Sequence, residues 1–284
     1  MNKNTKLIIV IVALVAMIGL SVYSITKEGG WDFGKAWETQ EQTTAQMVKE
    51  TEEVQTQTQT QEETETAEET IASTGYTVVI DPGHQAHQNA DQEPIGPGAA
   101  ETKKKVTSGT AGNYTGVAEH EVNLTVSKKL REELTARGYE VVMTRETADV
   151  DLSNSERAAI ANESGDIFVR IHCNSSTNTS AQGALTISPT PNNPYVGEMY
   201  QSCRKLSDSI LEGMTASAGC LSQGVMEVDN MSGINWCQIP VTIVEMGYMS
   251  NQTEDNLLVT DEYQNKMAQG IANGIDAYFG ITRE

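Results

Sequence analysis

Positive charge is scarce in this sequence, in which 19 Lys and Arg residues stand against 39 Asp and Glu residues. The formal net charge of -20 argues against a nucleic-acid partner, because phosphate binding requires clustered basic side chains. The four cysteines form no Cys-x-x-Cys pair, and their spacing assigns no disulfide, so buried or free thiols are an equally good interpretation. No internal repeat and no second domain are visible in the downstream part of the sequence.

Only one long apolar run is present, from Leu7 to Ile25, and Lys3 and Lys6 precede it. Its nineteen residues span about 28 Å as a helix, close to the thickness of a bilayer core. No clear Ala-x-Ala cleavage site follows the run. The run is also longer than the apolar region of about 7–15 residues that is usual in a signal peptide. We therefore favour an uncleaved membrane anchor over residues 1–27, with cleavage as the alternative, and expect the rest of the chain to lie outside the membrane.

Residues 28–74 carry twelve acids and two Lys residues and are dominated by Thr, Gln and Glu, and the stretch Thr51–Thr70 has almost no large apolar residue. Such a segment buries too little surface to offset the entropy of ordering it. We expect a disordered acidic linker there. Trp31, Phe33 and Trp37 follow the apolar run and are interpreted as interfacial aromatics.

Apolar strands alternate with amphipathic helices from residue 75 to residue 284. Tyr76–Ile80, Tyr139–Thr144, Ile167–Ile171, Gly183–Ile187 and Ile239–Val244 are predicted strands. Val122–Arg137, Ser153–Asn162, Met199–Thr215 and Asp261–Phe279 are predicted helices, the first closed by Gly138. This alternation predicts a single α/β domain with a twisted, mostly parallel sheet that helices cover on both faces.

Three of the predicted strands lead into residues that bind metals or carry protons. His84 follows the first strand across a Pro-Gly turn, His172 follows the strand at 167–171, and Glu245 follows the strand at 239–244. Ligands of open α/β sheets bind outside the carboxyl ends of the strands. These three side chains are therefore expected at one edge of the sheet.

A further carboxylate comes from the start of the helix near residue 119. At about 100° per residue, Glu119 lies on the side of the apolar residues Val122, Val126 and Leu130. Glu121 lies on the solvent side, where a first-turn carboxylate interacts favourably with the helix dipole. Glu119 is thus the inward-facing candidate.

Two imidazoles and one carboxylate with an open fourth position form a recurring catalytic zinc set. Two His ligands favour a transition metal over magnesium or calcium, which take oxygen ligands. A lone His after a strand is more often a loop residue, so the residues alone leave a metal site and a group of unrelated polar residues as open alternatives. His87 and His120 are interpreted as surface residues.

Six short motifs occur in order along the predicted domain. They are Asp81-Pro82-Gly83-His84, Glu119 with Asn123 and Leu124, Thr144-Arg145, Arg157 with Asn162, His172 with Asn174, and Glu245 with Gly247, Ser250 and Asn251. Together they resemble the zinc-dependent N-acetylmuramoyl-L-alanine amidases of bacterial cell-wall hydrolysis, over about Tyr76 to Phe279.

The resemblance implies an α/β catalytic domain that cleaves the amide between N-acetylmuramic acid and L-alanine in peptidoglycan. It implies zinc ligands at His84, Glu119 and His172 and a catalytic glutamate at Glu245. It places the enzyme on the extracytoplasmic side of a bacterial membrane or in the cell wall, and it names no protein partner.

The sequence departs from the family pattern at three places. Arg170 stands where a small residue is common, and Cys173 where Ala is common. The segment 85–118 is long, with 34 residues between His84 and Glu119, and it carries the basic run Lys103–Lys105. We interpret this insertion either as a wall of the substrate groove or as an ordinary solvated loop. Asp81 is expected to support the site or the turn and not to bind metal.

Alternative functions differ in class. One is a non-catalytic peptidoglycan-binding module of the cell envelope, but the presence of all three ligands and the glutamate argues against it. A zinc peptidase or deacetylase is a second alternative, against which the motifs argue. No Ser or Cys stands in a nucleophile motif beside the available His residues, which disfavours a serine or cysteine hydrolase.

Overall fold

The computed structural model describes residues 72–283, which belong to one compact unit from Thr70 to Glu284. The predicted anchor at 1–27 and nearly all of the predicted linker at 28–74 fall outside the described residues. Between residues 72 and 283, every helix is too short or too polar to cross a lipid bilayer.

A six-stranded sheet forms the centre of the domain, in the order β4-β1-β5-β8-β6-β7. Its strands are β1 (Thr77–Pro82), β4 (Glu140–Met143), β5 (Ile167–Asn174), β6 (Ala184–Ser188), β7 (Ser222–Glu227) and β8 (Val241–Tyr248). All neighbouring pairs are parallel except β6 and β8, which are antiparallel. The predicted α/β domain with a mostly parallel sheet is confirmed.

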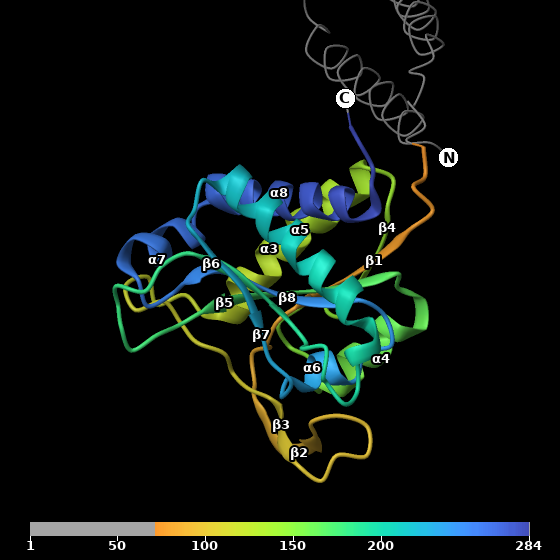
Figure 1. Cartoon of the computed structure of the whole chain (residues 1–284). Helices are drawn as coiled ribbons and strands as arrows, with labels where there is room; N and C mark the ends of the chain where they lie inside the picture. Colours follow the sequence, from red (N-terminus) through yellow and green to blue (C-terminus); the bar gives the residue numbers. More distant parts are fainter. Residues whose placement is uncertain (1–71, 284) are drawn as a thin grey trace, which may run out of the picture. The chain divides into compact units, whose positions relative to one another are not determined.

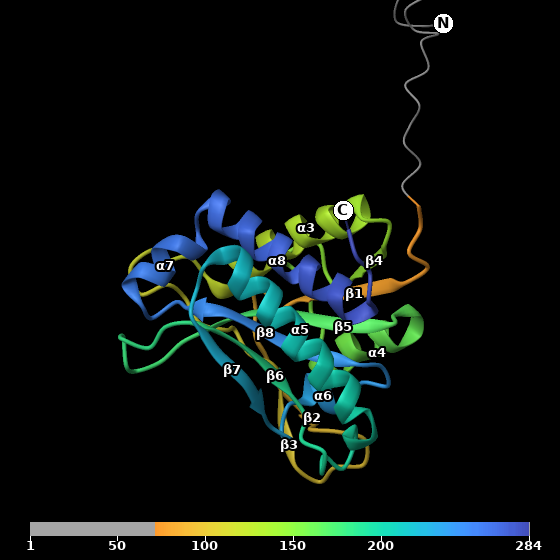
Figure 2. The same cartoon turned by 45° about the horizontal axis from the view of Figure 1, so that its top comes forward.

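Helices cover both faces of the sheet (Figure 1). One face carries α3 (Glu119–Ala136), α5 (Tyr200–Ala218) and α8 (Asp261–Phe279), and the other carries α4 (Asn154–Ser164) and the short α6 (Ser232–Asn235). The view in Figure 2 shows the same two layers, with α5 and α8 side by side. The short helix α7 (Gln252–Leu258) and the 3-10 turn η1 (Gly197–Met199) complete the main domain.

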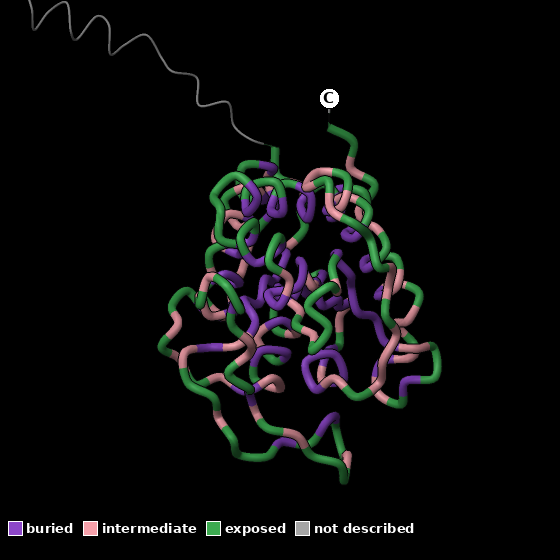
Figure 3. Tube along the Cα trace, turned by 90° about the vertical axis from the view of Figure 1, so that its left-hand side faces the viewer, coloured by how far each residue is buried: buried purple, intermediate pink, exposed green. Residues whose placement is uncertain are grey.

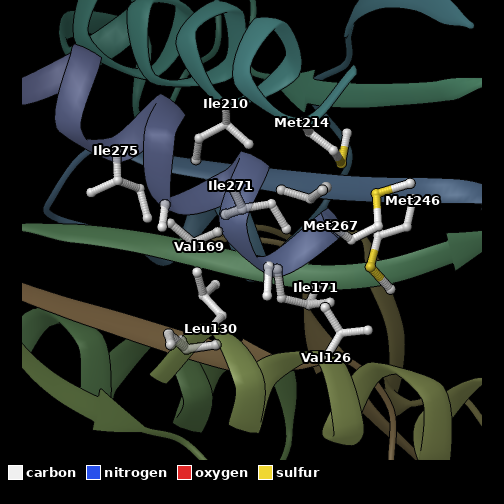
Figure 4. Packing of buried hydrophobic residues seen from close by; sticks show 14 of the residues in the cluster. Val126, Leu130, Val169, Ile171, Ile210, Met214, Met246, Met267, Ile271 and Ile275 are labelled. Carbon is white, nitrogen blue, oxygen red and sulfur yellow. The ribbon is translucent and has the colours of Figure 1, made fainter. Parts of the chain in front are cut away.

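The larger apolar core lies between the sheet and the helices α3, α5 and α8. Figure 4 shows Val169 and Ile171 of β5 packed between Leu130 of α3 and Ile271 of α8. Each of these four side chains is fully buried, and such burial stabilises a protein by roughly 1.5–3 kcal/mol per large aliphatic side chain. This core fixes the carboxyl ends of the strands in space.

Side chains along β5 and β8 alternate between the two faces of the sheet. This alternation decides which residues lie on the face that bears α4 and α6. Ile167, Val169 and Ile171 point into the larger core, so Phe168, Arg170 and His172 point toward the face of α4 and α6. On β8, Val244 and Met246 belong to the larger core, which puts Ile243 and Glu245 on that same opposite face. Because successive side chains of a strand alternate between faces, Arg170, His172 and Glu245 all lie on the same side of the sheet.

Most boundaries predicted from the sequence are confirmed within a few residues, and the last helix spans the predicted residues. Ser153 caps α4 through a capping box with Glu156, and Gly138 follows α3 with φ of 84°. The edge strand β7, the helices α6 and α7 and the hairpin described next were not predicted. All four cysteines are free, and three of them are buried.

The insertion between His84 and α3 folds into a separate antiparallel hairpin of β2 (Asn89–Pro94) and β3 (Thr102–Val106). In Figure 1 it extends from the lower end of the domain, and Figure 3 shows that much of its trace is exposed or half-buried. Its buried Glu93 accepts hydrogen bonds from the backbone and hydroxyl of Ser155 at 3.2 and 2.7 Å. The Trp236 indole donates to the carbonyl of Pro94 at 3.0 Å. The insertion is therefore a docked element and not a free loop.

Candidate metal centre

His84 lies in the turn that follows β1, in a left-handed backbone conformation with φ of 60°. This conformation is costly for a residue with a side chain and marks a constrained position. Its Nδ1 lies 2.9 Å from the carbonyl oxygen of Thr107. Because a carbonyl only accepts, Nδ1 donates the proton, and Nε2 keeps the lone pair that a metal requires.

His172 is the sixth residue of β5 and faces the same side of the sheet. The turn glycine Gly83 makes this position possible, since a Cβ atom at residue 83 would overlap the imidazole ring of His172. Burial lowers the pKa of His172 to about 4, and this effect outweighs the opposing hydrogen bond to Glu119. The imidazole is therefore neutral at pH 7, which is its metal-binding form.

Glu119 begins α3 and is 3% exposed, whereas Glu121 is exposed, as predicted from the helix phase. Its Oε1 lies 3.2 Å from His84 Nε2 and 3.2 Å from His172 Nδ1. Burial by itself would raise the pKa of Glu119, but its interactions with the imidazoles of His172 and His84 hold that pKa well below the usual range. The carboxylate is therefore ionised.

The three predicted ligands converge on one point. Their ligand atoms lie within 4.8 Å of one another, although the residues come from a turn, a helix and a strand. Two imidazoles with one ionised carboxylate form the donor set of many catalytic zinc sites. The buried Nε2 of His172 has no hydrogen-bond partner in the described chain, which suits a group whose partner is a ligand. The residues present thus fit a divalent transition metal.

Glu245 stands beside this set, because β5 and β8 pair His172 directly with Glu245. Its Oε2 is buried without a hydrogen-bond partner among the described residues. Burial raises the pKa of Glu245 well above its usual value, and the negative charge of Glu119 adds to the effect. A carboxyl group with a raised pKa beside the candidate metal centre is suited to accept and return a proton.

An arginine cluster beneath the turn supports His84. Asp81 is fully buried and forms ion pairs with Arg157 at 2.7 Å and Arg170 at 2.8 Å. Arg145 donates to the carbonyls of Pro82 at 2.8 Å and Gly83 at 3.0 Å. Asp81 therefore supports the turn, as expected. The motifs included Arg145 and Arg157, but sequence reasoning assigned neither residue a role.

The insertion contributes to the site in ways that the sequence did not reveal. Thr107 orients His84, and the backbone N–H of Thr110 donates to Oε2 of Glu119 at 2.9 Å. Gly109, with φ of 75°, allows the chain to pass close by, because a Cβ there would lie 2.7 Å from Glu119 Oε2. Of the other histidines, His87 is exposed as predicted, and His120 is half-buried.

A cavity of about 410 Å³ opens beside the histidines and Glu245. Its walls come from the ends of β5 and β8, from β6, from the hairpin strand β3 and from the segment that enters α6. The lining residues used below are His172, Glu245, Arg170, Lys103, Lys104 and Gly233. Ile187 and Ile243 give it an apolar patch. Most of its lining residues are polar or charged, as suits a polar substrate.

Comparison with known proteins identifies this architecture. The family model described as N-acetylmuramoyl-L-alanine amidase matches residues 78–277. The uncharacterized protein YqiI of Bacillus subtilis is 32% identical over 206 residues, which cover 72% of this chain and 85% of that protein. The N-acetylmuramoyl-L-alanine amidase LytC of Bacillus subtilis is 29% identical over 208 residues, which cover 72% of this chain but only 36% of LytC.

A solved structure agrees with these sequence matches. The N-acetylmuramyl-L-alanine amidase Ami1 of Mycobacterium smegmatis superimposes with a TM-score of 0.65 at 27% identity, over 74% of this chain and 98% of Ami1. The family match over residues 78–277 includes all of the motifs that carry the candidate site. The chain belongs to the N-acetylmuramoyl-L-alanine amidase family and is a hydrolase of that class.

Proposed function

We propose that His84, Glu119 and His172 hold a zinc ion and that Glu245 is the general base and acid of amide hydrolysis. The substrate bond is the amide between N-acetylmuramic acid and L-alanine in peptidoglycan. The observation that carries the proposal is the position of Glu119 Oε1, which is 3.2 Å from a nitrogen of each imidazole. The register pairing of His172 with Glu245 supports the role of Glu245 as proton carrier.

Zinc in this set would supply a polarised amide carbonyl and a water molecule whose pKa is lowered to about 7. Side chains and backbone of this protein supply the proton transfer and the positioning of the ligands. Glu245 takes the proton of the attacking water on a carboxylate oxygen and later delivers it to the leaving nitrogen of L-alanine. The Thr107 carbonyl fixes the ring of His84, and Gly83 leaves room for the ring of His172.

The proposed organisation of the chain follows from the sequence. Residues 75–284 form the catalytic domain, residues 28–74 a linker, and residues 1–27 a membrane anchor or a cleaved signal. The enzyme would then act on peptidoglycan outside the membrane. The apolar run after Lys3 and Lys6 supports this arrangement.

Product analysis tests the proposal. Peptidoglycan is digested with the purified full-length protein, and the products are analysed by mass spectrometry. We expect stem peptides with free L-alanine amino termini and glycan strands with free muramic acid carboxyls. Chelation should abolish release, and stoichiometric zinc should restore it. Cleavage between sugars or within the stem peptide would contradict the assignment, and full activity after chelation would contradict the role of the metal.

A further inference from the structure

One wall of the cavity beside the candidate metal centre is positively charged, although the chain as a whole carries a net charge of -20. Lys103, Lys104 and Arg170 line it, and Glu245 is the one acidic residue among the described residues that do so. A cationic pocket in an acidic protein concentrates anionic ligands locally.

Beneath this wall, positive charge is present in excess. Asp81 is the one carboxylate shared by Arg157 and Arg170, and all three side chains are almost fully buried. Buried charges are normally paired, so two guanidinium groups on one carboxylate leave about one positive charge to be balanced. Since Arg170 also lines the cavity, that charge is directed toward the space where substrate would bind.

Two of the three nitrogens in the guanidinium group of Arg170 form hydrogen bonds within the described residues. Nε donates to Asp81 at 2.8 Å and Nη2 donates to Asn154 at 2.7 Å. Nη1 has no hydrogen-bond partner in the described part of the chain. It lies against the backbone of Gly233, another cavity residue, where a Cβ atom would overlap it. Arg170 as a whole is 4% exposed, and its hydrogen bonds to Asp81 and Asn154 hold the guanidinium group in place.

The two hairpin lysines that line the cavity, Lys103 and Lys104, differ in how firmly they are held. Lys103 donates to the carbonyl oxygen of Asn230 at 2.6 Å and is thereby tied to the segment before α6. Lys104 is exposed, lines the cavity and forms no ion pair with any residue between 72 and 283. Lys104 is therefore the mobile cation at the rim, and Arg170 is the fixed one at the base.

The spacing of residues along β5 sets the distance between Arg170 and His172, beside which the scissile amide would lie. Arg170 precedes His172 by two residues on β5, which corresponds to about 7 Å along the strand. One peptide residue spans at most about 3.6 Å, so the residue after L-alanine in a stem peptide reaches a comparable distance from the amide. The carboxyl of muramic acid is consumed in that amide, so the free carboxylates lie on the stem.

We propose that Arg170 and Lys104 form a carboxylate-binding subsite for the residue that follows L-alanine in the stem peptide. The enzyme would then prefer stems in which this residue is a free acid over stems in which it is the amide. This inference rests on the proposed function, because it presumes that the muramoyl–alanine amide lies at the metal centre.

The test uses two muropeptides that differ only in this residue, one with glutamate and one with glutamine, both with the same blocked C-terminus. For the full-length zinc enzyme we expect kcat/KM about tenfold higher for the acid, mainly through KM, as for a charge-assisted hydrogen bond. Lys104→Ala should reduce the preference by about twofold to fivefold, as for an exposed charge pair. Lys104→Glu should remove or reverse it.

Two further variants complete the design. Arg170→Lys keeps a positive charge beside Asp81 but removes Nη1, and it should also lower the preference. Lys266→Ala removes one positive charge from the exposed surface of α8, away from the cavity, and should leave the preference unchanged. Because the readout is a ratio between two substrates, partial loss of folded enzyme does not affect it.

Equal kcat/KM for both muropeptides would overturn the subsite while leaving the amidase function intact. A preference that survives both Lys104→Glu and Arg170→Lys would overturn the assignment of these residues. Turnover of neither muropeptide would count against the proposed function, and therefore against the subsite as well.

Discussion

His172 and Glu245 are register partners on the parallel strands β5 and β8, and they stand side by side on the face of the sheet that also bears α4 and α6. The pairing brings together a candidate metal ligand and a candidate proton carrier that lie far apart in the sequence. Because both positions belong to buried central strands, their separation is set by the sheet and not by flexible loops.

The first prediction concerns the role of Glu245 in proton transfer. Glu245→Gln keeps the size of the side chain but removes its ability to accept a proton. We expect kcat for muropeptide hydrolysis to fall by about 10²–10⁴-fold, with one zinc still bound per chain. Zinc content is measured by atomic emission and thermal stability by calorimetry. Wild-type turnover in this variant would remove Glu245 from the mechanism.

The second prediction concerns the ligand set. His84→Ala and His172→Ala each remove one imidazole, so zinc affinity should fall by more than about 100-fold, since outer partners alone contribute about 10–100-fold. Competition with a chromogenic chelator gives the affinity. His87→Ala, at an exposed site on the same segment, serves as the control and should bind zinc normally. Undiminished affinity in either ligand variant would contradict the assignment.

The third prediction tests the space that Gly83 leaves for His172. A Cβ atom at residue 83 would overlap the imidazole ring, so Gly83→Ala should displace His172 and weaken zinc binding. Gly98→Ala is the matched control, because Gly98 has φ of 76° and open space around its Cβ direction. Gly98→Ala should destabilise the folded state by about 1–2 kcal/mol through backbone strain, and it should leave the zinc affinity unchanged. Equal zinc affinities for the two variants would argue against the steric role of Gly83.

The fourth prediction concerns acid stability. Burial alone would raise the pKa of Asp81, but Arg157, Arg170 and Thr144 outweigh it and hold that pKa far below the unfolded value of 3.8. A depressed carboxyl pKa stabilises the folded state above the unfolded pKa, and this contribution is lost as the pH falls below it. Asp81→Asn should therefore reduce the free energy of unfolding by about 3 kcal/mol at pH 7.

The difference between wild type and Asp81→Asn should narrow as the pH falls below 3.8. Urea denaturation of both proteins in the presence of a chelator, at pH 7 and at several pH values below 4, measures this difference without a contribution from zinc. A difference that stays constant over the whole range would show that Asp81 contributes through its shape and not through its charge.

The sequence predicted the secondary structure best where local signals were strong. The helix at 261–279 begins after Thr260, whose side chain accepts from the backbone of Tyr263, and it ends at Gly280 in a left-handed conformation. The edge strand β7 was not predicted, because Ser222–Glu227 contains two glutamine or glutamate side chains and a glycine and gives no clear alternation. Its pairing with β6 stabilises it, and such pairing is invisible in a local pattern.

The candidate site was predictable in part. Strand ends and helix phase selected His84, His172, Glu245 and Glu119, since those periods are local properties of the chain. The sequence could not show that Thr107 orients His84, because that contact depends on how the insertion folds back across 23 residues. Nor could it choose between a solvated loop and a docked hairpin for the segment that carries Lys104.

The sequence by itself determined the α/β class, the four residues of the candidate centre and the family, because periodicity and ordered motifs are written along the chain. Only the tertiary structure decided that β5 and β8 are neighbours in register, that Asp81 is shared between Arg157 and Arg170, and that the hairpin forms one wall of the cavity. The physical reason is that these relationships arise from pairing and packing between distant segments, whose energies depend on the fold as a whole.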